Sequence, residues 1–278
     1  LGLALGMTAG QPFPKFSKKT SKYLLQFSVV GLGFGMNLHE SLRTGKEGML
    51  FTVVSVVAVL ALGMYLGKRL MMDRKTAYLI SAGTAICGGS AIAAVAPVVK
   101  ANDNEMSMSL GTIFILNAIA LFIFPPIGHL LGLSQEQFGM WAAIAIHDTS
   151  SVVGAGAAYG EQALEIATMV KLTRALWIIP VTIATMFIFK QKGAKISIPW
   201  FIFFFILAMV ANTFLTIPET ITSSLVWLAK KGLTVTLFLI GAGLSRKVIK
   251  QVGVRPMVQG VILWVFIGLI SLGVIMLV

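Results

Sequence analysis

Cysteine is nearly absent from this sequence. Cys87 is the only one, which excludes an internal disulfide and a metal site built from several thiolates. The three histidines, His39, His129 and His147, are scattered without the spacing of metal ligands. The chain contains no Walker A, GxSxG or HExxH motif, so it carries no enzyme signature and no nucleotide site for a primary pump. We therefore expect no catalytic residue, no cofactor and no metal site.

Charged side chains are also scarce, at 12% of the chain, whereas 57% of the residues are hydrophobic and the mean hydropathy is +0.90. This balance excludes an ordinary soluble domain. Four stretches of 19 to 26 residues contain no Lys, Arg, Asp or Glu, and each is long enough for a helix to cross a membrane. They are residues 49–67, 106–131, 196–218 and 256–278. The composition predicts an all-α, polytopic membrane protein.

Hydropathy and turn signals divide the chain into about ten membrane-spanning segments. They are residues 1–9, 20–39, 48–67, 75–100, 105–131, 135–160, 162–189, 197–217, 219–246 and 254–278. The first segment is already apolar and has no basic region before it, unlike a signal peptide. We interpret it as the end of a span that begins upstream, and we expect further N-terminal sequence in the full-length protein.

Lysine and arginine alternate in number between successive loops. Of 22 such residues, 15 lie in loops 10–22, 68–75, 190–195 and 246–255. Five lie in the opposite loops, namely Arg43, Lys46, Lys100, Lys230 and Lys231. Because cytoplasmic loops carry an excess of Lys and Arg, the first group is predicted to face the cytoplasm. The net charge of +12 is thus mainly a topology signal, and we expect no nucleic-acid partner.

The segment at 75–100 contains a weak point at Cys87, Gly88, Gly89 and Ser90. Glycine is a poor helix former, and inside a membrane a broken helix is tolerated only where protein or a wet cavity surrounds it. Secondary transporters bind their substrates at such breaks. We predict a break between residues 86 and 91, with a half-helix from Ser90 opening onto a polar cavity. Alternatively, these small residues serve only close helix packing.

A second polar group, His147, Asp148, Thr149, Ser150 and Ser151, lies deep in the segment at 135–160. Such groups are expensive in a membrane unless they are paired or wet. One interpretation is an ion or proton relay, in which Asp148 carries charge, His147 exchanges protons and the hydroxyl groups donate hydrogen bonds. The alternative is a structural one, with Asp148 as the N-cap of a helix.

Two basic residues, Lys171 and Arg174, lie three positions apart within a further predicted span. This spacing puts them on one face of a helix. They could form an electropositive wall that faces Asp148 or an anion. They could equally snorkel to the membrane surface or form a static ion pair with Glu161 or Glu165.

Internal similarity offers three repeat registers. Residues 84–105 match 143–165 weakly at an offset of 60, but two complete spans at these places would run in the same direction. A second comparison pairs residues 20–67 with 219–278. The third, which we favour, pairs 75–100 with 219–246 as antiparallel spans that cross where each is broken.

The favoured register needs a second break at Lys230-Lys231-Gly232. It predicts an inverted-repeat transporter fold with broken, crossing helices. Residues 1–46 and 135–195 would then form scaffold helices, and residues 47–131 and 196–278 would form the transport core. If 75–100 crosses 135–160 instead, the offset of 60 is the meaningful register.

Four stretches carry a resemblance to a known family: ICGGSAIAAVAPVVKA, AIHDTSSVVGAG, KLTRALWIIP and GAGLSRKVIKQVGVRPMVQG. Together they resemble the bacterial sulfate exporter family, an uncharacterised membrane family placed with the sodium/proton antiporter and bile-acid symporter superfamily. The resemblance covers essentially the whole chain. It implies the bacterial plasma (inner) membrane, a fold of crossed broken helices, a transport role and an anionic substrate.

The sequence therefore predicts a secondary transporter or exchanger of a small anion, sulfate-like or a sulfonate. The expected partners are that solute, a proton or sodium ion for coupling, and the lipid bilayer; a homodimer is compatible with the sequence. The first alternative is a sodium or proton antiporter with Asp148 as the carrier. The second is a channel, because half-helices also build pores.

Overall fold

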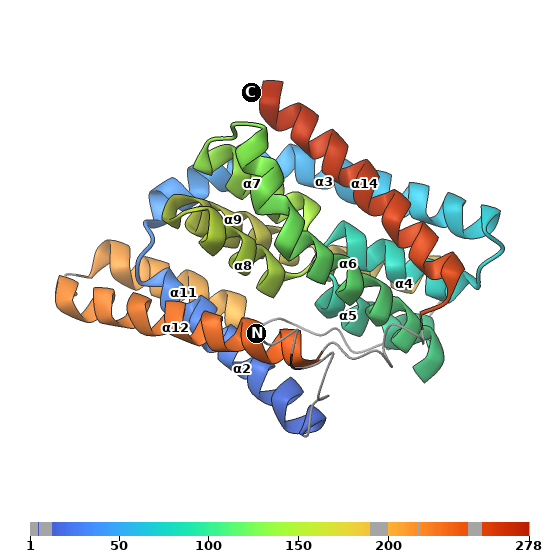
Figure 1. The fold of residues 1–278 in the computed structure, drawn as a ribbon, viewed down its shortest axis with the longest axis horizontal. Coiled ribbons are helices and arrows are strands. Elements are labelled where there is room, and N and C mark those ends of the chain that lie inside the picture. The colour runs from blue at the N-terminus through green and yellow to red at the C-terminus, as the bar shows by residue number, and fades with distance from the viewer. Residues whose placement is uncertain (1–4, 6–12, 190–199, 216, 244–251, 278) are drawn as a thin grey trace. The chain divides into compact units, whose positions relative to one another are not determined.

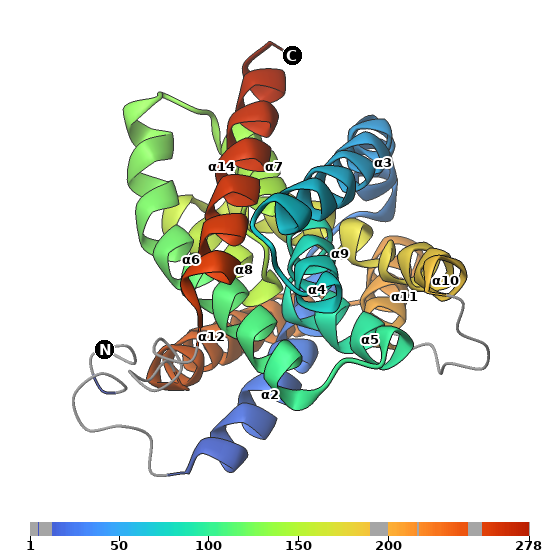
Figure 2. The same cartoon turned by 90° about the vertical axis from the view of Figure 1, so that its right-hand side faces the viewer.

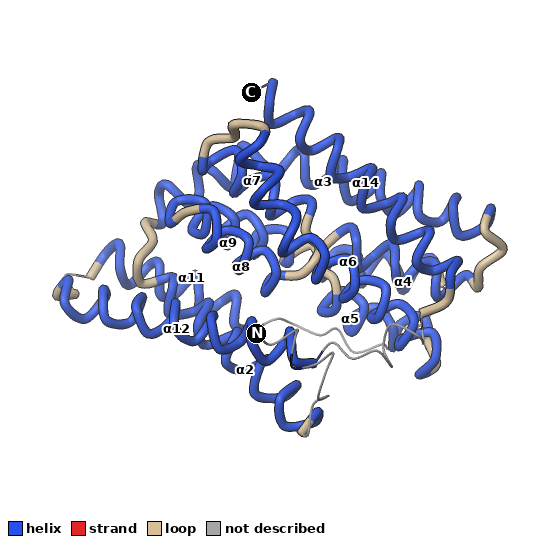
Figure 3. The backbone as a smooth tube through the Cα atoms, in the orientation of Figure 1, coloured by secondary structure: helices blue, strands red, loops and turns tan. Residues whose placement is uncertain are grey.

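The structure, a computed structural model, describes residues 5, 13–189, 200–215, 217–243 and 252–277. Every regular element in these ranges is a helix (Figure 3). The helices form two compact units: residues Leu1–Glu47 with Pro199–Arg246, and Gly48–Ile198 with Lys247–Val278. This grouping joins 135–198 to 48–131, and the predicted division into scaffold and core stays a prediction.

Among its described residues, the first unit holds α2 (Pro14–Gly33), α11 (Trp200–Phe214), α12 (Glu219–Gly243) and the beginning of α3 (Leu38–Arg69). Small residues bring α2 close to α11 and α12. A Cβ at Gly31 would lie 2.9 Å from the Cβ of Ala229 on α12, and one at Gly33 would lie 2.8 Å from the carbonyl oxygen of Phe205 on α11. Contacts of this kind are typical of helix pairs in membranes. The glycines of α2 therefore serve helix packing.

Helix α12 corrects the predicted break at Lys230-Lys231-Gly232, because it continues through these residues to Gly243. Gly232 faces Ser28 of α2, where an added Cβ would collide with the serine hydroxyl. This glycine lets a neighbouring helix approach and does not interrupt its own. The register that pairs 75–100 with 219–246 therefore lacks its second break.

The second unit contains all four helices that are long and apolar enough to cross a membrane among the described residues (Figure 1). They are the Phe51–Arg69 part of α3 (Leu38–Arg69), α6 (Asp103–Leu130), α9 (Glu161–Ala175) continued by α10 (Ile178–Ile188), and α14 (Val254–Leu277). Figure 2 shows α14 running beside α6 and α7 (Gln135–Ala145), and α14 is in contact with both. Four of the ten predicted segments are thus present as span-length helices.

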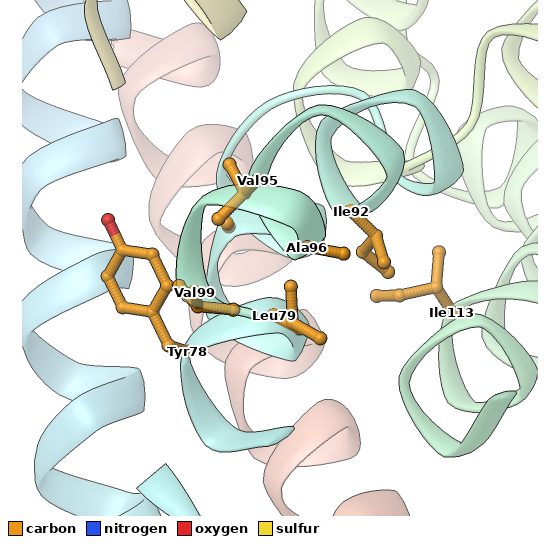
Figure 4. Packing of buried hydrophobic residues seen from close by; sticks show 8 residues of the cluster. Tyr78, Leu79, Ile92, Val95, Ala96, Val99 and Ile113 are labelled. Atoms are coloured by element: carbon orange, nitrogen blue, oxygen red, sulfur yellow. The ribbon is translucent and has the colours of Figure 1, made fainter. Parts of the chain in front are cut away.

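The segment at 75–100 folds back on itself and does not cross. Its two helices, α4 (Arg74–Ala85) and α5 (Gly89–Val99), lie side by side. The ammonium group of Lys75 donates to the carbonyl oxygen of Lys100 at 2.9 Å, so the two ends of the segment meet. Tyr78 and Leu79 pack against Val99 in the same buried cluster (Figure 4). We call residues 74–100 hairpin 1.

The segment at 135–160 is a second hairpin, formed by α7 and α8 (Thr149–Tyr159). The rings of Phe138 and Tyr159 stack with their centroids 3.8 Å apart, and the Tyr159 hydroxyl donates to the Leu133 carbonyl oxygen at 2.6 Å. Gln135 accepts a 3.0 Å hydrogen bond from the backbone N–H of Gln162. We call residues 135–160 hairpin 2. Both hairpins overturn the prediction of broken helices that continue across the membrane.

Local sequence explains where these helices begin. The carboxylate of Asp73 accepts from the N–H groups of Lys75 and Thr76 at the start of α4. Helix α7 begins with a capping box between Ser134 and Gln137. Side-chain acceptors of this kind satisfy N–H groups that have no partner within the helix.

Candidate functional site

The tips of the two hairpins meet inside the second unit. Hairpin 1 turns at Ile86-Cys87-Gly88, and hairpin 2 turns at Ile146-His147-Asp148. A Cβ at Gly88 would lie 3.1 Å from the carbonyl oxygen of His147. The predicted break between residues 86 and 91 is therefore confirmed, and its neighbour is the break in the segment that matches it at an offset of 60. We call this contact the tip junction.

Gly88 makes the turn of hairpin 1 sterically allowed. Its backbone has φ of 64° and ψ of −120°, a combination that only glycine adopts readily. Its N–H donates to the Gly83 carbonyl oxygen at 2.8 Å and closes the end of α4, while its own carbonyl accepts from Ile92 at 3.1 Å. One glycine therefore both ends α4 and starts α5.

Lys171 lies on α9 and is fully buried against hairpin 2. Its ammonium group donates to the carbonyl oxygens of Ala143 at 3.2 Å and Ile146 at 2.7 Å. These carbonyls end α7, where the helix dipole is negative. A cation there stabilises the end of the half-helix.

Arg174, one turn further along α9, does the same for hairpin 1. It donates from one terminal nitrogen to the carbonyl oxygen of Ala85, the last residue of α4, at 2.5 Å. From the other it donates to the hydroxyl of Ser55 on α3 at 3.0 Å. Its side chain is fully buried.

The two cations therefore face inward and bind only neutral groups. Burial overturns the idea that Lys171 and Arg174 snorkel to the surface. The acceptors of their hydrogen bonds are the carbonyl oxygens of Ala143, Ile146 and Ala85 and the hydroxyl of Ser55, and the ion pair with Glu161 or Glu165 stays a prediction. Two buried basic side chains thus adjoin the tip junction.

Asp148 occupies the structural role that was the alternative to a relay. It is the N-cap of α8, and its carboxylate accepts from the N–H groups of Ser150 at 3.1 Å and Ser151 at 3.2 Å. The Ser150 hydroxyl donates to the same oxygen. Thr149 is buried beside it in the first turn of α8. A relay through Asp148 stays a prediction.

His147 is fully buried at the tip of hairpin 2. Its backbone N–H donates to the side-chain oxygen of Asn117 on α6 at 3.0 Å. Both ring nitrogens lack a hydrogen-bond partner among the described residues. Asn117 thereby holds the tip of hairpin 2 against α6.

The start of α5 differs from the start of α8, because no side chain caps it. Cys87 is buried before it, Gly89 is half-buried and Ser90 is exposed. The polar cavity expected at this helix start stays a prediction. Ser55 and Thr84 were not predicted from the sequence, since a single hydroxyl residue in an apolar helix gives no signal of its partner.

Comparisons with known proteins reveal a broad family. The family described as conserved hypothetical protein 698 matches residues 1–260. A UPF0324 membrane protein of Bacteroides thetaiotaomicron is 66% identical over 278 residues, which cover 99% of this chain and 84% of the relative. A UPF0324 membrane protein of Porphyromonas gingivalis is 57% identical, covering 100% of this chain and 86% of the relative. One from Geobacter sulfurreducens is 51% identical, covering 98% and 87%. No solved structure matches the chain.

Proposed function

The chain belongs to the conserved hypothetical protein 698 family of multi-pass bacterial membrane proteins, and we propose that it is a secondary transporter or exchanger of a small anion. One observation carries the proposal: two fully buried cations, Lys171 and Arg174, adjoin the meeting tips of two helical hairpins. Ionisable residues inside membranes are expensive and usually mark a substrate or ion path. Because both cations have neutral partners, their charge favours an anion nearby.

The hairpins also support an inverted repeat. Each hairpin returns to the end of the unit from which it starts, and each is followed by one helix of span length, α6 or α9–α10. Because a hairpin followed by one long helix crosses the membrane once, the next hairpin starts on the opposite side of the membrane. Residues 74–130 and 135–188 would then be related by inversion at an offset of about 60, as transporter repeats are.

The long helix of each half supports the hairpin of the other half. Asn117 on α6 accepts from His147 in hairpin 2, whereas Arg174 on α9 donates to Ala85 in hairpin 1. A two-fold axis that relates the two halves would produce these reciprocal hydrogen bonds. The weak match at an offset of 60 thus becomes the preferred register, because its spans need not run in the same direction.

The orientation in the membrane follows from charge. At the end of the second unit where hairpin 1 opens, Lys75 contacts Lys100 and Arg255 contacts Met71. The opposite end, where hairpin 2 opens, carries Glu136 in its capped turn. By the positive-inside rule the basic end would be cytoplasmic, now with Lys100 included. Loop 190–195 and residues 246–251, part of the same prediction, lie outside the described residues.

An antiporter that carries a cation on Asp148 has less support. That carboxylate is occupied as the cap of α8. A cation site needs several oxygen or nitrogen ligands, and no cluster of three His, Cys, Asp or Glu side chains occurs in the described ranges. The anion proposal requires no such cluster.

Flux through proteoliposomes tests the function. Purified protein would be reconstituted and offered radiolabelled sulfate, sulfite, methanesulfonate or acetate under imposed proton or sodium gradients. We expect saturable uptake of at least one anion, accelerated by the same anion inside the vesicle. Anion current without this acceleration would instead identify a channel. Sodium–proton exchange without any anion flux would overturn the proposal in favour of the antiporter.

A further inference from the structure

Buried polar groups without a hydrogen-bond partner gather at the tip junction. Seven such side-chain atoms occur among the described residues, and five belong to four residues at the junction. These five atoms are the Thr84 hydroxyl, the Asn117 amide nitrogen, both ring nitrogens of His147 and the Arg174 Nε. The other two, on Thr182 and Gln259, belong to α10 and α14. Native proteins leave few such atoms unpaired, so this concentration points to a missing partner.

The four residues come from four elements; Asn117, His147 and Arg174 are tied to the tips by hydrogen bonds or by position, and Thr84 adjoins Ala85 along the chain. Asn117 accepts from the backbone of His147, so its amide nitrogen lies beside the tip of hairpin 2. Arg174 binds the carbonyl of Ala85, the residue that follows Thr84 at the end of α4. Lys171 binds the carbonyl of Ile146, the residue that precedes His147 at the tip of hairpin 2. The unpartnered atoms therefore border the contact between the two tips.

The chemistry of these atoms selects the ligand. The Nε of arginine and the amide nitrogen of asparagine can only donate hydrogen bonds, a histidine ring offers at least one N–H, and a hydroxyl can donate. Cationic side chains supply the charge, while the nearby Asp148 carboxylate is held by the backbone of α8. A ligand here must bring acceptors and a negative charge.

We infer that Thr84, Asn117, His147 and Arg174 form a buried binding site for a small oxyanion, such as a sulfate, sulfonate or carboxylate group. This inference rests on the proposed function and names the residues that contact the anion. Oxyanions match the site because each oxygen accepts from several donors, and charge-assisted hydrogen bonds are the strong ones. In a site without competing solvent, these bonds and the two cations would act together.

Two sets of variants test the site through sulfate binding. Binding would be measured by calorimetry on the detergent-purified chain. A titration with chloride at equal ionic strength serves as the reference. Asn117→Asp keeps the oxygen that accepts from His147 and replaces the donor by a negative oxygen. We expect it to weaken sulfate binding at least tenfold, roughly the effect of one charge-assisted hydrogen bond.

Thr84→Val and Thr182→Val form a matched pair. Both hydroxyls are buried and unpartnered, with 1% and 0% of the residue exposed, but only Thr84 borders the junction. We expect Thr84→Val to weaken binding about threefold, the effect of one neutral hydrogen bond, and Thr182→Val to leave it unchanged. The pair decides the question even if Asn117→Asp fails to fold, which gel filtration would reveal.

The outcomes separate the site from the function. If folded Asn117→Asp and Thr84→Val bind sulfate as the wild type does while anion flux persists, the site is elsewhere and this inference is overturned. The inference is also overturned if the wild type transports anions but binds none of sulfate, sulfite, methanesulfonate and acetate. Water would then be the partner of the polar atoms at the junction. If the wild type neither binds nor moves any of these anions, the proposed function fails as well.

Discussion

Single residues at the tip junction serve structure and charge at the same time. Lys171 and Arg174 each close the carbonyl end of one half-helix, so both are part of the fold before any solute arrives. Asp148 caps the start of α8 in the equivalent way, with the opposite charge. A substitution at any of the three therefore needs a readout of stability beside one of binding.

We expect Lys171→Met to abolish anion binding and to lower the stability of the protein. It leaves the carbonyls of Ala143 and Ile146 buried without a donor, at a cost of about 1–3 kcal/mol for each unsatisfied group. Thermal unfolding in detergent, with and without sulfate, measures both effects. Lys231→Met is the control, because Lys231 is an exposed cation on α12 and its removal should change neither. Unchanged stability of Lys171→Met would contradict the capping role.

We expect Asp148→Asn to retain anion transport, because the amide oxygen can still accept from the N–H groups of Ser150 and Ser151. Asp148→Ala removes the cap and should lower stability by about 1 kcal/mol. Flux in proteoliposomes and thermal unfolding measure the two effects. If Asp148→Asn is properly folded but inactive, the carboxylate itself takes part in transport, as the antiporter requires.

At the scale of elements, the reversal of each hairpin depends on its tip. In hairpin 1 the reversal is made by Gly88, whose positive φ turns the chain and whose missing side chain leaves room for the His147 carbonyl. In hairpin 2 the chain turns through extended residues, with Ile146 and Asp148 at φ of −88° and −108°. The two tips are thus built differently although they meet.

We therefore expect Gly88→Ala to destabilise the protein by roughly 1–3 kcal/mol, the usual effect of a strained backbone position, and to impair transport. Gly89→Ala is the matched control. Gly89 is the first residue of α5, and an added Cβ would approach the ring of Phe114 at 3.3 Å and the side chain of Leu110 at 3.5 Å. Thermal unfolding of the two variants tests this. Equal stability of the two variants would mean that the tips can separate without any loss of protein stability.

At the scale of the whole molecule, the hairpins change the path of the chain through the membrane. Two complete spans at 75–100 and 135–160 were predicted, but each segment starts and ends at the same end of its unit. In the topology that we propose, two crossings are lost together, so the predicted side of every later loop would stay the same. Of the segments between the predicted spans, Lys100 and the turn at 131–134 would change sides.

Cysteine labelling tests this path directly, since Cys87 is the only cysteine and can be replaced by alanine. Single cysteines would be introduced at Lys75, Lys100 and Gly132, and intact cells treated with a membrane-impermeant maleimide. We expect positions 75 and 100 to be protected together and position 132 to react. Reaction at 100 with protection at 75 would restore the crossing helix and refute the hairpin.

The sequence by itself determined the membrane class, four span-length helices and the place of the first break. These are local properties: hydropathy over about 20 residues fixes a span, and Gly88 with Gly89 weakens a helix wherever they occur. The same local property of glycine predicted a break at Gly232. This prediction was wrong, because α12 tolerates the glycine where it packs closely against Ser28 of α2.

Only the tertiary structure decided which way the chain leaves each break and what the breaks contact. The return of α5 along α4 depends on packing between residues such as Tyr78 and Val99, which are distant in sequence. The meeting of Gly88 with His147, and the partners of Arg174, join positions about 60 to 120 apart. A sequence pattern records the residue types at such positions but not their distances, so the tip junction emerged from the fold alone.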